Sequence, residues 1–82
     1  MGTQTDQKQF LQNLTLGYTG NFCSDNLKIE VQKHREHEPI EYRAKFFHSI
    51  AGTWKAYCTS ISCYVGDILE DCKQEIKIYE TN

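Results

Sequence analysis

The sequence predicts a single small α+β domain over residues 1–82, with a short N-terminal helix, an antiparallel meander of four to five strands, and a helical turn before the last strand. Phe10, Leu11 and Leu14 have helical spacing near the N-terminus, and apolar and polar residues alternate from Leu27 onward. The stretch Ile40–Val65 has the pattern of one long β-hairpin. The alternative fold is a small all-β barrel, which requires a full strand over residues 14–22.

Composition limits both the size of the core and the classes of function. With 82 residues, of which 39% are hydrophobic, the chain can build one modest core. Its 9 Lys and Arg residues are balanced by 11 Asp and Glu residues, and this net charge of −2 argues against a general nucleic-acid binder. The N-terminus lacks an apolar signal region, and no later stretch approaches the roughly 18 apolar residues of a membrane span. We therefore expect a soluble cytoplasmic protein.

The N-terminal elements have an ambiguous boundary. Residues 4–13 have the spacing of an amphipathic helix, with Phe10 and Leu14 on one side. From Leu14 the period changes to alternation, which indicates a strand over residues 14–22 that is weakened by its glycines. The alternative is a helix that continues through Leu16 and is followed by a loop. Residues 27–32 then alternate regularly and predict a strand with one buried face.

The central hairpin allows a register to be predicted. Gly52, in the two-residue turn with Ala51, supplies the positive φ that such turns require. The predicted cross-strand pairs are Ser49 with Trp54, Phe47 with Ala56, Phe46 with Tyr57, Ala44 with Thr59, Tyr42 with Ile61 and Ile40 with Cys63. This register places Tyr57, Thr59, Ile61 and Cys63 toward the core and Trp54, Ala56, Cys58, Ser60 and Ser62 on the opposite face. Both strands then agree on the apolar face, and a slip of one residue would bury charges.

The end of the chain is predicted to be a helical turn followed by a strand. Residues 66–73 place Cys72 on the inward side of a short helix with Asp67 as its cap. Residues 75–79 alternate, with Ile76 and Ile78 inward, which indicates a closing strand.

Four cysteines can be bridged or free. In an oxidising environment the expected disulfide joins Cys63 and Cys72, because both are predicted to point inward. Otherwise we expect free, mostly buried thiols, since the spacing lacks the C-x-x-C of zinc sites. Cys58, outward with Lys45 opposite, is the best isolated nucleophile candidate because a nearby ammonium lowers a thiol pKa. No base is evident beside it, so no catalytic residue is assigned.

The candidate binding site is an aromatic patch at the turn end of the hairpin. Phe47 and Trp54 lie on the predicted outer face, with Lys45 beside them and Lys55 close by on the other face. Large aromatic residues in such a place require a cover, which is either the N-terminal helix or another protein molecule. We therefore expect a non-enzymatic protein-binding or regulatory module that binds another protein or itself as a homodimer and needs no cofactor.

Two other functions are weighed against this one. A small thiol- or metal-dependent protein would use Cys58 or the loop with His34 and His37, although their spacing differs from the helical arrangement of metalloproteases. A single-stranded nucleic-acid binder would stack bases on Phe47, Trp54 and Tyr57. The missing basic surplus argues against it, and no metal ligand is assigned.

Overall fold

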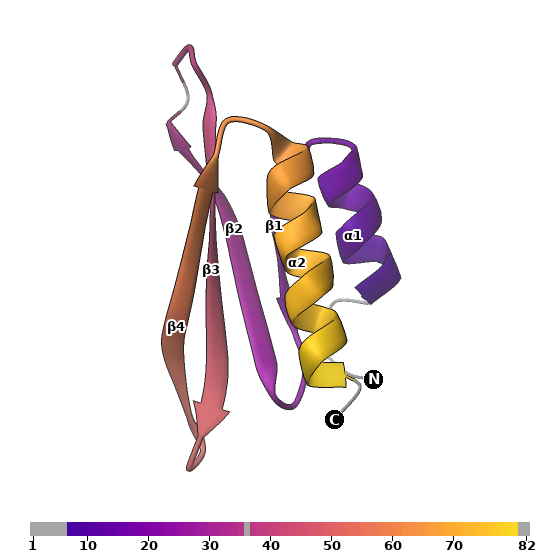
Figure 1. Cartoon of the computed structure of the whole chain (residues 1–82), viewed down its shortest axis with the longest axis vertical. Coiled ribbons are helices and arrows are strands. Elements are labelled where there is room, and N and C mark those ends of the chain that lie inside the picture. The colour runs from indigo at the N-terminus through magenta and orange to yellow at the C-terminus, as the bar shows by residue number, and fades with distance from the viewer. Residues whose placement is uncertain (1–6, 36, 81–82) are drawn as a thin grey trace.

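The computed structural model describes residues 7–35 and 37–80 and has the predicted α+β architecture (Figure 1). The elements are α1 (Gln7–Thr15), β1 (Gly20–Cys23), β2 (Leu27–Arg35), β3 (Glu41–Ile50), β4 (Thr53–Ser62) and α2 (Val65–Glu80). The strands form an antiparallel meander in the order β1-β2-β3-β4. This sheet is open, so the barrel alternative is wrong. Within the described ranges, neither helix has the length and apolarity needed to cross a membrane.

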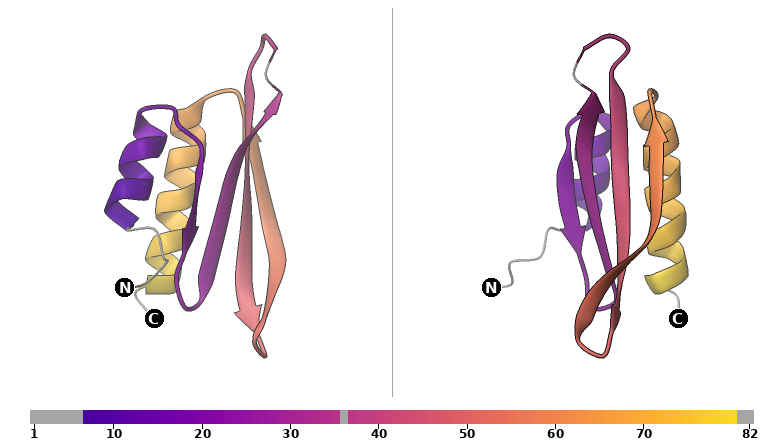
Figure 2. Two further views of the ribbon diagram at one scale, coloured as in Figure 1. Left: turned by 180° about the vertical axis from the view of Figure 1, so that it is seen from behind. Right: turned by 90° about the vertical axis from the view of Figure 1, so that its left-hand side faces the viewer.

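Both helices lie on the same side of the sheet (Figures 1 and 2). We term the side that they cover the inner face and the opposite side the outer face. α1 lies against β1 and α2, and α2 lies against β3 and β4. The core between the layers consists of buried residues from every element except β4: Phe10, Leu14, Phe22, Leu27, Ile29, Val31, Ala44, Phe46, Ile68, Cys72 and Ile76. The outer face is not covered by any helix of the described chain.

The first helix ends in a glycine cap. The backbone N–H groups of Gly17 and Tyr18 donate to the carbonyl oxygens of Leu14 and Asn13, each at 2.9 Å, and the φ of Gly17 is +88°. This pair of bonds is the Schellman motif, which needs a left-handed residue that glycine adopts without strain. The predicted strand over residues 14–22 is therefore wrong in its first half, where the alternative of a helix followed by a loop holds, whereas residues 20–22 lie in β1.

The second strand and the hairpin turn have the predicted structure. Leu27, Ile29 and Val31 are buried on the inner face of β2. Ala51 and Gly52 have φ values of +52° and +80°, as the two central residues of a type I′ hairpin turn require.

A β-bulge changes the hairpin register beyond the turn. The pairs nearest the turn are those predicted, but Phe46 pairs with Cys58, which leaves Tyr57 as an extra residue in β4. Every later pair is displaced by one residue, as the pairing of Ala44 with Ser60 shows. The predicted pairs of Phe46 with Tyr57, Ala44 with Thr59 and Tyr42 with Ile61 are therefore wrong.

The bulge also exchanges the faces of the last residues of β4. Ser60 and Ser62, which were predicted on the outer face, face α2 instead. Thr59 and Ile61 lie on the outer face, where Ile61 is 51% exposed. The prediction of these faces failed because two residues of β4 oppose one residue of β3, which reverses the alternation downstream.

The C-terminal segment is one helix, so the predicted strand over residues 75–79 is wrong. The buried residues of α2 recur at every fourth position: Ile68, Cys72 and Ile76. Each of them is preceded directly by a carboxylate: Asp67, Asp71 and Glu75. A spacing of four places each set on one helical face. Ile78, predicted inward, is 45% exposed.

The three carboxylates of α2 accept hydrogen bonds from hydroxyl groups of β4, and we term these bonds the carboxylate ladder. Ser62 Oγ donates to Asp67 Oδ2 at 2.8 Å, Ser60 Oγ to Asp71 Oδ2 at 2.5 Å and the Tyr57 hydroxyl to Glu75 Oε1 at 2.6 Å. Because the two serines face α2 only beyond the bulge, the ladder depends on the bulge. It attaches α2 to a strand that contributes no fully buried apolar residue to the core.

Ser60→Ala removes the hydroxyl that donates to Asp71, a half-buried carboxylate. We expect the free energy of unfolding, measured by urea denaturation, to fall by about 1.5–3 kcal/mol, because hydrogen bonds to charged groups contribute that much. The matched control is Ser49→Ala, which alters an exposed strand residue and should change stability by less than about 0.5 kcal/mol. Equal losses for the two variants would contradict the role of the ladder.

Candidate functional site

The two aromatic residues predicted to form a site lie together on the outer face. Phe47 pairs with Ala56, and Trp54 pairs with Ser49, as the register near the turn predicted. Both aromatic side chains are half-buried. The structure therefore brings these two residues to one place at the hairpin end of the sheet.

A lysine of the neighbouring strand completes this site. The Lys28 ammonium lies 4.8 Å from the ring centroid of Phe47 and 5.8 Å from that of Trp54, and it is 3.6 Å from a Glu30 carboxylate oxygen. An ammonium at this distance over an aromatic face is attracted by the electrons of the ring. We term Phe47, Trp54 and Lys28 the aromatic patch.

Sequence reasoning missed Lys28, although it placed this residue on the polar side of its strand. The missing information was the pairing of β2 with β3, in which Lys28 lies opposite Phe47. That register could not be counted from the sequence, because the connection from Arg35 to Glu41 is not a two-residue turn and β2 contains an irregularity between Lys33 and Arg35.

The two lysines predicted near the aromatic residues, Lys45 on their face and Lys55 on the other, lie on different faces. Lys45 is on the outer face, paired with Glu30 on one side and Thr59 on the other. Lys55 is paired with His48 on the inner side of the sheet and is exposed. The structure therefore brings Lys45, but not Lys55, to the side of the aromatic patch.

The N-terminal helix does not cover the aromatic patch. Phe10 and Leu14 of α1 are buried in the core, and the Phe10 ring lies 5.6 Å from that of Phe22. Figure 2 shows α1 on the helical side of the sheet, away from the outer face. The alternative of an internal cover by this helix is therefore wrong, because its apolar side is used by the core.

Tyr57 belongs to an aromatic cluster on the inner face. Its ring lies 4.8 Å from that of His48 and 5.9 Å from that of Tyr79, and the Tyr79 hydroxyl is 3.5 Å from His48 Nδ1. Burial, followed by the hydrogen bond to Glu75, raises the pKa of the Tyr57 phenol. The outer face therefore offers two aromatic rings for base stacking, and not the three that were predicted.

The cysteines are free thiols in three different environments. Cys58 and Cys63 are exposed, Cys23 is half-buried and Cys72 is buried, so the predicted disulfide of Cys63 with Cys72 is absent. Cys63 is not a core thiol, because the bulge removes it from the inner face. Cys58 lies opposite Phe46, and Lys45 lies opposite a different residue, so the predicted ammonium beside the Cys58 thiol is also absent.

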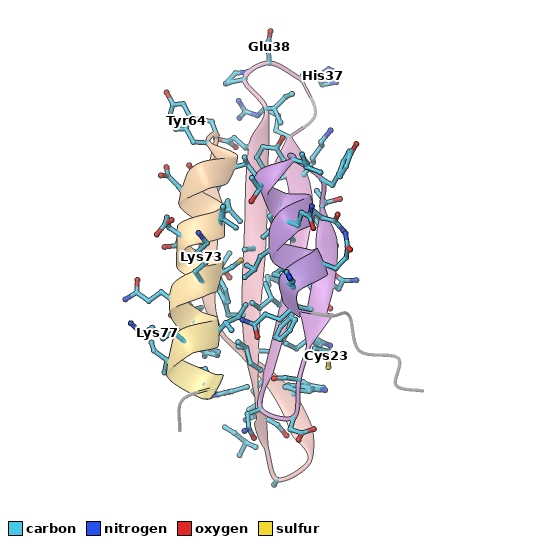
Figure 3. All side chains as sticks on the ribbon, turned by 90° about the vertical axis from the view of Figure 1, so that its right-hand side faces the viewer. Cys23, His37, Glu38, Tyr64, Lys73 and Lys77 are labelled. Atoms are coloured by element: carbon cyan, nitrogen blue, oxygen red, sulfur yellow. The ribbon has the colours of Figure 1, made fainter. Side chains whose placement is uncertain are left out.

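The histidine loop does not form a metal centre within the described chain. His34 and His37 are exposed, and Figure 3 shows His37 and Glu38 at the far tip of the loop between β2 and β3. No group of three or more His, Cys, Asp or Glu side chains among the described residues could hold a metal ion.

Two hollows lie away from the aromatic patch. A cavity of about 140 Å³ between α1 and β1 is lined by Phe10, Asn13, Leu14, Tyr18, Thr19, Gly20 and Asn21. Ligand pockets usually exceed about 300 Å³, so this cavity is small for a cofactor. An open groove of about 390 Å³ follows the side of α2 that carries Lys73 and Lys77 (Figure 3). Neither hollow contains one of the four cysteines or three histidines.

Comparison with known proteins adds no family to this description. No protein-family model, curated protein or solved structure matches the chain. The site is therefore defined by the geometry of the outer face.

The buried thiol of Cys72 predicts a loss of stability in alkaline solution. Burial, with smaller contributions from Asp71 and Glu75, raises the pKa of Cys72 from 9.0 to about 12. Between these values the unfolded chain has lost the thiol proton while the folded chain keeps it, so rising pH favours unfolding. The contribution is fully present below about pH 9.

Urea denaturation at a series of pH values from about 8 to about 12 checks this expectation. The free energy of unfolding of the wild type should fall more steeply than that of Cys72→Ala, which has no thiol to ionise. Parallel curves for the two proteins would show that Cys72 does not carry the effect.

Proposed function

We propose that this protein is a non-enzymatic protein-binding module and that its binding surface is the outer face of the sheet, centred on the aromatic patch. One observation carries the proposal. Both helices of the described chain pack on the inner face, and the outer face holds two large aromatic side chains without a helix over them (Figure 2). Trp and other aromatic residues contribute disproportionately to the affinity of protein interfaces.

The environment of the rings supports a protein partner over a nucleic acid. Base stacking uses the faces of aromatic rings. The Lys28 ammonium already lies over both rings, so it occupies ring surface that stacked bases would need. A protein can instead contact the exposed edges of the rings and the aliphatic stem of Lys28.

The charges of the outer face also favour another protein over a second copy of this chain. Lys28, Arg43 and Lys45 lie on this face. A two-fold symmetric dimer through the same face would bring two copies of this cationic surplus together, and like charges across an interface are unfavourable.

Trp54→Ala tests the proposal by removing the larger ring of the aromatic patch. A partner protein captured by the wild type and purified should bind this variant with a Kd weakened by about 30-fold, equivalent to about 2 kcal/mol for an interface hot spot. Circular dichroism should show an intact fold, because Trp54 lies outside the core.

The matched control is Tyr64→Ala, which removes a 70% exposed aromatic side chain at the start of α2, on another part of the surface (Figure 3). We expect this variant to keep wild-type affinity. The proposal is wrong if Tyr64→Ala abolishes binding while Trp54→Ala does not. Quenching of Trp54 fluorescence by single-stranded oligonucleotides, without any protein partner, would instead support nucleic-acid binding.

A further inference from the structure

The charges of the chain are divided unevenly between its two layers. The four strands contain six Lys or Arg residues and two Glu residues, a formal charge of +4. By contrast, α2 contains five Asp or Glu residues and two Lys residues, a formal charge of −3. The net charge of −2 therefore conceals a cationic sheet beneath an acidic helix.

Three of these cations lie on the outer face near the two aromatic rings. Lys28 belongs to the aromatic patch, and Lys45 and Arg43 lie beside it. Lys45 and Arg43 follow Phe47 at steps of two residues along β3, on the same face, at about 6.6–6.8 Å per step. Lys28 lies on the neighbouring strand. Two carboxylates lie on the same face: Glu30, paired across the strands with Lys45, and Glu41, two residues before Arg43 and paired with Arg35. With Arg35 included, the four cations of this face outnumber its carboxylates by two.

An apolar line, interrupted by Thr59, runs along the outer face of β4 next to these cations. Trp54 and Ala56 lie at the hairpin end of the outer face, and Ile61 lies near the other end, 51% exposed. Adjacent strands are about 4.8 Å apart, so each apolar residue has a residue of β3 as its close neighbour. Arg43 is the direct partner of Ile61 in the register.

We propose that the outer face binds a protein segment in which Asp or Glu side chains alternate with large apolar side chains. The apolar side chains of the segment bury against Trp54 and Ile61, and its carboxylates pair with Arg43 and Lys45. This inference rests on the proposed function and adds the chemistry of the partner. A segment with alternating acidic and apolar side chains is complementary to this face, because the surplus of cations lies directly beside the apolar line.

A random peptide library displayed on phage, selected on the whole wild-type chain, tests this inference. We expect the selected peptides to be enriched in Asp and Glu next to Leu, Ile, Phe or Trp. A synthetic peptide of the most enriched sequence should bind Arg43→Glu/Lys45→Glu at least about tenfold more weakly, because two attractions become repulsions. The same double variant, used for selection, should enrich Lys and Arg in place of Asp and Glu.

Two further variants control for net charge and for folding. Lys8→Glu/Lys73→Glu changes the net charge by the same amount on the exposed surfaces of α1 and α2 and should keep wild-type affinity. Arg43→Gln/Lys45→Gln removes the two charges without introducing new ones, and its affinity should lie between those of the wild type and the glutamate variant.

The outcomes separate this inference from the proposed function. Peptides that lose binding on Trp54→Ala but show no acidic enrichment overturn the inference and leave the proposed function intact. Equal affinity for the wild type and Arg43→Glu/Lys45→Glu also overturns it. Peptides indifferent to Trp54→Ala, or a library that yields no binder, count against both.

Discussion

The β-bulge opposite Phe46 is the constraint on which both layers of this structure depend. By adding Tyr57 to β4, it turns Ser60 toward α2 and Ile61 toward the outer face. The same extra residue therefore creates the hydrogen bonds that attach the C-terminal helix and the apolar line that we propose as part of the binding surface. Without the bulge, the register would place Ile61 against α2 and leave Asp71 without its hydroxyl partner.

The inner and outer faces of the sheet differ because both helices are attached to the inner face. α1 contributes its apolar side to the core, and α2 contributes both an apolar stripe and a carboxylate stripe to the inner face. Asp67, Asp71 and Glu75 of α2 are thereby held against the inner side of β4, whereas the cations beside the aromatic patch lie on the outer face. An interaction surface with a positive surplus can thus exist on a chain whose net charge is negative.

Much of the fold could be predicted from local patterns, because alternation specifies β2 and Gly52 specifies the hairpin turn. The bulge could not be predicted, because Thr59, Ser60, Ile61 and Ser62 fit either register equally well. The large apolar side chain of Ile61 favoured the unbulged register, which is wrong. The spacing of Asp67, Asp71 and Glu75 was a signal for one continuous helix that the short alternation near the C-terminus obscured. Phe47 and Trp54 could be placed from the turn alone. Lys28 required a long-range register that the sequence does not encode locally.

The register of β3 and β4 is the most direct test of this description, and cross-strand nuclear Overhauser contacts between backbone protons measure it. The structure predicts contacts of Phe46 with Cys58 and of Ala44 with Ser60. Contacts of Ala44 with Thr59 and of Tyr42 with Ile61, in place of Ser60 and Ser62, would instead show an unbulged hairpin. That result would contradict the carboxylate ladder and the outer position of Ile61 together.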